Sequence, residues 1–227
     1  MGREQTIDRR RRLLLQQALA LGFAAGGWPL AQALQPPARR LSVQAMYGPV
    51  WINGLRATET MPIGPADHLE TGHEAQLIAL VGGDALLLRG NTELQLVPGP
   101  RPSFQLLGGA VLASFAPRSQ GIELQTPTAT VGMQGGCLYA ALVSGRSYIC
   151  TCEGHARLSA RSNAKVAEDV VGRRHEAARY VLERPQGGRL IEPARFAGHN
   201  EAERVTLETL AGRRSATPPA RTPNIRR

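Results

Sequence analysis

The sequence predicts an all-β domain of many short strands, followed by one short C-terminal helix. Between residues 41 and 180, apolar runs are interrupted by Gly, Pro and Asp at intervals of about eight to twelve residues, which is typical of strands in a sheet. Asn-Gly and Gly-Gly pairs between the runs indicate hairpin turns. We expect a curled sheet, a roll or a sandwich, with a β-solenoid-like stack as the alternative.

The expected strands follow one another along the chain with short connections. The first, residues 48–54, ends in the turn Asn53-Gly54, and glycine pairs separate several of the later ones. The next strands are expected at residues 75–81, 85–89, 93–97, 104–107, 110–115, 122–126 and 128–133. The frequent Gly, Pro and Asp residues leave no stretch suited to a long helix.

The last expected hairpin contains all three cysteines of the chain. Its strands are residues 137–143 and 146–152, and its two-residue turn is Ser144-Gly145. In this register Cys137 lies opposite Cys152, and opposed side chains on neighbouring strands are close enough for a disulfide with some strain. A disulfide between Cys137 and Cys152 is therefore the leading prediction, because it is the default fate of close thiols in an oxidising compartment.

The same register places Cys150 opposite Tyr139 and all three sulfurs on one face of the sheet, which leaves two other interpretations open. One is a set of buried thiols that act as small hydrophobic groups. The other is a metal-binding or redox site formed by Cys137, Cys150, Cys152 and His155, with zinc or copper as the ion, since thiolates favour such soft ions.

The helix is expected at residues 199–212. Asn200 can cap its first turn, and Glu203, three residues later, can complete a capping box. Gly212 is placed to end it. Apolar contacts with the sheet are expected from Val205, Leu207 and Leu210.

The first 33 residues have the layout of a cleavable export signal. Arg9–Arg12 form a basic stretch, Leu13–Ala25 form an apolar run, and Ala31-Gln32-Ala33 offers the small-residue pattern of a cleavage site. The segment Arg11–Gln16 resembles the twin-arginine signal, which exports folded proteins. We therefore expect a periplasmic protein with no stable membrane span after cleavage.

The net charge of +9 is concentrated at the two ends of the chain. Residues 1–33 and 213–227 together hold ten of the 27 basic residues and two of the 18 acidic ones, which leaves 17 and 16 in between. A body so close to neutrality does not predict nucleic-acid binding. The Pro- and Arg-rich tail 213–227 is expected to be disordered.

Several motifs, in order, resemble the FecR domain over roughly residues 42–160. They are Gly48-x-Val50-x-Ile52-Asn53-Gly54, Leu69-Glu70-Thr71-Gly72, Gly83-Asp84-Ala85, Gln125–Val131 and Gln134–Tyr139. The resemblance implies a periplasmic β domain that binds or senses an envelope protein or a small ligand, neither of them identified. Only twelve residues precede the apolar run, so the sigma-factor contact of the iron-citrate regulator is not expected here.

No motif of a hydrolase, a nucleotide-binding enzyme or a metalloprotease occurs in the sequence, so an enzyme is not expected. A glycan-cleaving enzyme would need two facing carboxylates, which no sequence pattern pairs. The predicted organisation is a signal peptide at 1–33, a FecR-like β domain at 34–198, the helix at 199–212 and the tail at 213–227. Its predicted function is non-catalytic binding or sensing, with the metal or redox site as the alternative.

Overall fold

The computed structural model of the chain describes residues 42–59, 61–173, 175 and 177–213. The predicted signal peptide, its twin-arginine motif and the basic tail after Arg213 lie outside the described residues. Fifteen strands and one helix make up the described part.

The strands are short up to residue 125 and long in the cysteine region that follows. They are β1 (Ser42–Tyr47), β2 (Val50–Ile52), β3 (Leu55–Arg56), β4 (His68–Thr71), β5 (Gln76–Val81), β6 (Asp84–Leu88), β7 (Glu93–Val97), β8 (Ser103–Gly108), β9 (Ala110–Phe115), β10 (Ile122–Gln125), β11 (Ala129–Val143), β12 (Arg146–Ala160), β13 (Asn163–Gly172), β14 (Ala177–Gln186) and β15 (Arg189–Pro193). The helix is α3 (Glu201–Leu210).

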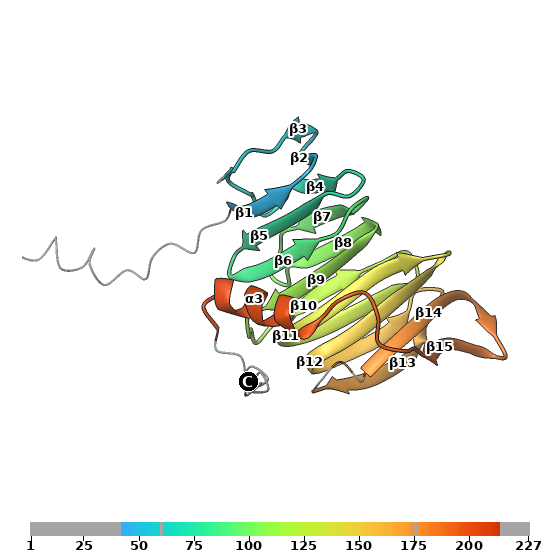
Figure 1. Cartoon of the computed structure of the whole chain (residues 1–227). Coiled ribbons are helices and arrows are strands. Elements are labelled where there is room, and N and C mark those ends of the chain that lie inside the picture. Colours follow the sequence, from blue (N-terminus) through green and yellow to red (C-terminus); the bar gives the residue numbers. More distant parts are fainter. Residues whose placement is uncertain (1–41, 60, 174, 176, 214–227) are drawn as a thin grey trace, which may run out of the picture. The chain divides into compact units, whose positions relative to one another are not determined.

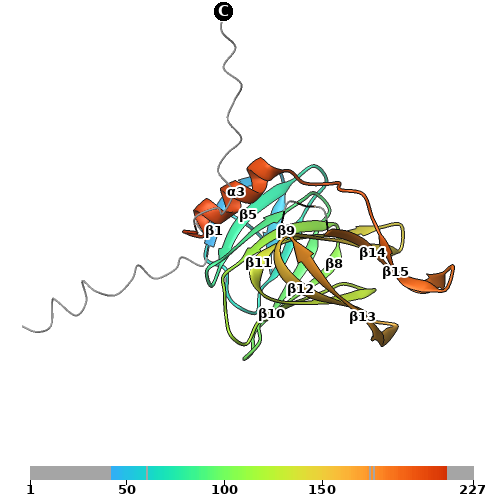
Figure 2. The same cartoon turned by 90° about the horizontal axis from the view of Figure 1, so that it is seen from below.

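All fifteen strands belong to one sheet, in the order β1-β5-β6-β9-β11-β10-β8-β7-β4-β2-β3 (Figure 1). The long strand β12 pairs with β11 and carries β13 and β14 on its other side, and β15 pairs with β14. Neighbours are antiparallel except β8 and β10. The sheet curls into a half-barrel (Figure 2), which confirms the predicted curled all-β fold and not the β-solenoid-like alternative.

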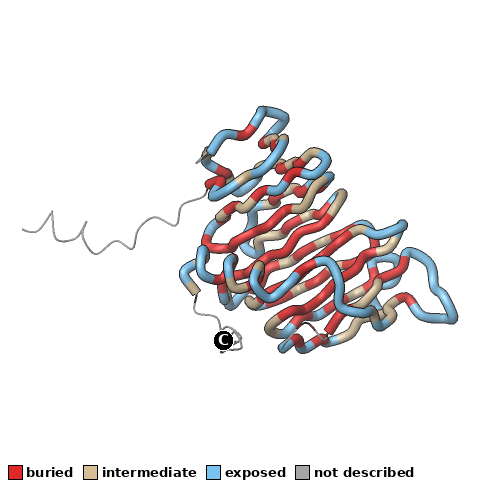
Figure 3. The backbone as a smooth tube through the Cα atoms, viewed as in Figure 1, coloured by how far each residue is buried: buried red, intermediate tan, exposed pale blue. Residues whose placement is uncertain are grey.

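The curl separates two apolar clusters. Alternate residues of the strands, such as Leu77, Leu88 and Phe115, fill the larger cluster inside the curl. The residues between them on the strands, such as Leu87 and Leu112, point to the other side of the sheet and form a smaller cluster on its outer face. Because both of their faces are covered, β6 and β9 are buried at every position (Figure 3).

The helix begins where the sequence predicts, but not all of its predicted apolar contacts form. The Asn200 side chain accepts a hydrogen bond from the Glu203 N–H, and the Glu203 carboxylate accepts one from the Asn200 N–H. Leu207 is buried, whereas Leu210 is 37% exposed, so the prediction for Leu210 was wrong. The other buried side chains of α3 are Arg204 and Glu208, a charged pair that hydrophobic periodicity does not reveal. Within the described residues, no helix has the length and hydropathy needed to cross a membrane.

Candidate metal centre

Two of the three cysteines lie side by side on the outer face of β12. Cys150 and Cys152 are two residues apart on an extended strand, so their side chains point to the same face, and both are fully buried. The turn at Ser144-Gly145 forms as predicted, and Tyr139 lies opposite Cys150.

The predicted register fails two residues beyond Tyr139, at Cys137. A bulge after Leu138 shifts the pairing, so that Cys137 lies opposite Glu153 and not opposite Cys152. Gly136 and Gly154 pair one step beyond this bulge with positive φ angles of 115° and 100°, and a Cβ on Gly136 would lie 2.2 Å from the Glu153 carbonyl oxygen. The bulge inserts one residue into β12, which breaks the simple two-residue count used for the hairpin. All three cysteines are free thiols in the structure, so the predicted disulfide is not formed.

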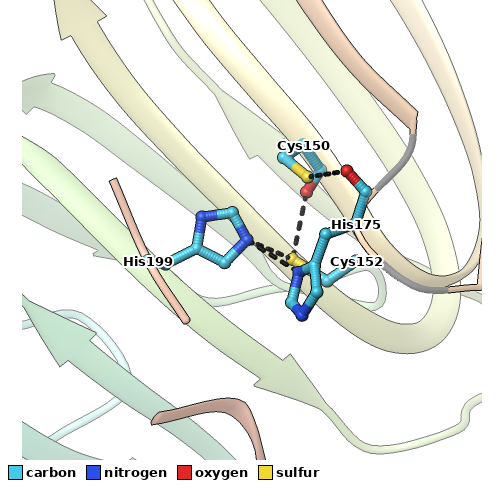
Figure 4. Close-up of side chains that lie close together, drawn as sticks. All are labelled: Cys150, Cys152, His175 and His199. Carbon is cyan, nitrogen blue, oxygen red and sulfur yellow. Dashed lines mark hydrogen bonds between the residues drawn. The ribbon is translucent and has the colours of Figure 1, made fainter. Parts of the chain in front are cut away.

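Two histidines from distant parts of the chain complete the cluster around Cys150 and Cys152 (Figure 4). His175 lies in the connection between β13 and β14, and its carbonyl oxygen accepts a hydrogen bond from the Cys150 thiol. His199 is the residue before the N-cap of α3, and its Nε2 lies 3.0 Å from Cys152 Sγ. One ligand atom from each of the four residues lies within 4.8 Å of every other, and all four residues are buried.

The second nitrogen of each imidazole is already occupied. His199 Nδ1–H donates to the Ala197 carbonyl oxygen at 3.0 Å, and His175 Nε2–H donates to the Glu201 carboxylate at 3.0 Å. These partners leave His199 Nε2 and His175 Nδ1 facing each other at 3.0 Å, hydrogen-bonded when one of them carries a proton. Metal-binding histidines are oriented in this way, by a carbonyl or a carboxylate on the other ring nitrogen.

The pKa values of the two thiols shift in opposite directions. A hydrogen bond with Cys152 lowers the pKa of Cys150 far below its ordinary value, in spite of burial. Burial raises the pKa of Cys152. The hydrogen bond with Cys150 also raises the pKa of His175, and Arg204 lowers the pKa of Glu201 to about 2. The Glu201 carboxylate therefore stays ionised as the partner of His175.

Aromatic rings enclose the cluster and hold the segment that carries His199. The His199 ring stacks on Tyr139 with centroids 4.5 Å apart, and Phe196 packs edge-on against it at 4.7 Å. The Tyr148 hydroxyl donates to the Arg195 carbonyl oxygen and accepts a hydrogen bond from the Ala197 N–H. These contacts keep the approach to the four ligand atoms apolar.

The structure thus brings together only half of the predicted metal set. Cys150 and Cys152 belong to the cluster, and Cys137 lies beside it as a neighbour of Cys152. His155 is wrong as a ligand, because its side chain is 63% exposed and lies 3.8 Å from Asp169. Neither His175 nor His199 was singled out from the sequence, and His175 is only 8% exposed.

The four donors fit a zinc ion of the structural type. Two thiolates and two imidazoles are a common tetrahedral set, with Zn–S and Zn–N distances of about 2.3 and 2.0–2.1 Å. Two ligand atoms on a tetrahedral ion with these bond lengths lie about 3.3–3.8 Å apart, so the largest separations, up to 4.8 Å, need an inward shift of about 1 Å. A set of four protein ligands leaves no open position on a tetrahedral ion.

Comparisons with known proteins give little beyond the fold. No family model matches the sequence, and no match is found among curated proteins. Two crystal structures of a candidate anti-sigma factor from Parabacteroides distasonis ATCC 8503 are similar, at 11% and 10% identity and a TM-score of 0.47. The match covers 57% of this chain and 60% of those chains. Such a likeness is too weak to transfer a function, so the resemblance to FecR domains stays a prediction.

Proposed function

We propose that this protein is an exported, non-catalytic binding module whose ligand is one zinc ion held by Cys150, Cys152, His175 and His199. The observation that carries the proposal is the convergence of four buried ligand atoms, two sulfurs and two imidazole nitrogens, within 4.8 Å of one another. The nitrogens His175 Nδ1 and His199 Nε2 lie 3.0 Å apart and share a proton when no cation binds them. A metal ion satisfies both of them and the two thiolates at once.

The charge around the site favours a divalent ion over Cu(I). Two thiolates with Zn²⁺ and neutral imidazoles make a neutral complex, whereas the same ligands with Cu⁺ carry one negative charge. A net charge is costly at buried positions. The surroundings contain several carboxylates, because Glu153, Glu201 and Glu208 all pair with Arg204. Zinc therefore fits better than the copper alternative.

The closed ligand set supports a binding role without catalysis, since catalytic zinc sites keep a position for water or substrate. The features of residues 1–33 support a periplasmic location, and the motifs that resemble FecR domains support a role in sensing. The partner that would receive the signal is an envelope protein that these features do not identify.

Metal analysis of the purified full chain tests the proposal. We expect one zinc per chain by inductively coupled plasma mass spectrometry, and a cobalt-substituted form with the intense thiolate-to-cobalt absorption of a two-sulfur, two-nitrogen site. Cys152→Ser and His199→Ala should each lose the stoichiometric ion, whereas His155→Ala, a matched change of an exposed histidine, should keep it. A wild-type chain that binds no zinc or cobalt after reduction would overturn the proposal.

A further inference from the structure

The C-terminal segment, residues 194–213, lies across the outer face of the half-barrel (Figure 2). Leu207 is the buried apolar residue of α3, while Phe196 and Leu210 are 49% and 37% exposed. A helix of ten residues is not stable by itself in water. Something other than apolar burial must therefore contribute to holding this segment on the sheet.

Polar contacts supply part of that attachment. Arg89 of the sheet donates to the Gly198 carbonyl oxygen at 3.0 Å and to the Glu203 carboxylate at 2.8 Å. Arg204, whose side chain is 3% exposed, donates to Glu153 of β12 at 2.5 Å. These contacts attach the first two turns of α3 to the sheet.

The metal cluster is a further attachment, and it lies where the helix begins. His199 immediately precedes the N-cap Asn200, and Glu201, the partner of His175, is the first residue of the helix. An ion held by His199, His175 and the β12 cysteines would join three segments that are otherwise far apart in sequence: β12, the β13–β14 connection and the start of α3 (Figure 4).

We propose that the ion acts as a clasp, so that metal binding controls whether α3 is docked on the sheet. The inference rests on the proposed zinc site and adds its regulation. With the ion bound, His199 fixes the start of α3 over the outer apolar cluster that contains Leu87, Leu112 and Tyr139. Without it, the cross-link from His199 to Cys150, Cys152 and His175 is lost and the segment is released, which exposes that cluster. The metal ion is then a regulatory ligand, and exposure of the outer sheet face is the conformational response to its loss.

Coupling of this kind is reciprocal, because whatever the ion contributes to docking, docking contributes to the affinity for the ion. A change that weakens docking without touching a ligand must therefore weaken zinc binding. Leu207→Ala is such a change, since Leu207 is buried and is not a ligand. Leu210→Ala is the matched control on the same helix, because Leu210 is partly exposed.

Hydrogen exchange by mass spectrometry on the full chain, with zinc bound and after chelation, tests the clasp. We expect exchange in residues 200–212 to become at least about tenfold faster after chelation, while β7 and β8 stay unchanged. Zinc affinity should fall at least about tenfold in Leu207→Ala and stay unchanged in Leu210→Ala. Stoichiometric zinc with equal exchange in both states would overturn the clasp and leave the zinc site standing. A chain that binds no zinc would remove both.

Discussion

Zinc binding should raise the thermal stability of the domain by an amount that follows from mass action. An ion that binds the native state but not the unfolded chain stabilises it by about 4.1 kcal/mol when free zinc is 1,000 times the dissociation constant. The domain at residues 42–213 is in the size class in which 1 kcal/mol shifts the melting temperature by about 2–4 °C. Saturating zinc should therefore raise the melting temperature by about 8–16 °C relative to the chelated chain.

The assay is differential scanning calorimetry of the reduced chain at graded free zinc set by a buffered chelator. The melting temperature should rise with the logarithm of free zinc once zinc exceeds the dissociation constant. Cys152→Ser should lose this dependence, because it removes one of two thiolates, whereas His155→Ala should keep it. The reasoning is refuted if the melting temperature of the wild type does not depend on free zinc, or if His155→Ala loses the dependence as completely as Cys152→Ser.

Three further predictions concern the parts of the fold that support the site. Arg204→Met should lower the free energy of unfolding by about 3 kcal/mol in urea titrations, because it leaves the buried Glu208 carboxylate without its ion-pair partner. Adding Glu208→Gln to this variant should recover part of the loss, and no recovery would contradict this account. Gly136→Ala should cost about 2–4 kcal/mol, because its Cβ meets the backbone at a positive φ, whereas Gly132→Ala on the same strand, with open space around it, should change stability by less than about 0.5 kcal/mol; equal costs would argue against the bulge. Burial raises the pKa of Asp84, so the native state binds a proton at this carboxylate more tightly than the unfolded chain does. As the pH falls from 7 to about 4, the free energy of unfolding of the wild type should therefore rise relative to that of Asp84→Asn. The opposite trend would contradict the raised pKa.

Local sequence signals were sufficient for most of the strands and for the helix. Alternating apolar residues and glycine pairs predicted the strands around residues 75–115, because burial of one or both faces imposes that pattern wherever a strand lies. The capping box of Asn200 and Glu203 predicted the start of α3, because both hydrogen bonds form between residues three apart. The turn at Ser144-Gly145 likewise predicted that Tyr139 lies opposite Cys150.

The tertiary structure alone decided the register at Cys137 and the composition of the candidate site. Cys152 is an extra residue of β12 between the pairs Leu138–Thr151 and Cys137–Glu153, so counting residues from the turn predicted a pairing that does not form. His199 is 47 residues from Cys152 along the chain and 24 from His175, and only the path of β13, β14 and the C-terminal segment brings them within 3.0 Å. Residue types and local spacing therefore determined that the cysteines share a face, whereas long-range packing decided which histidines join them.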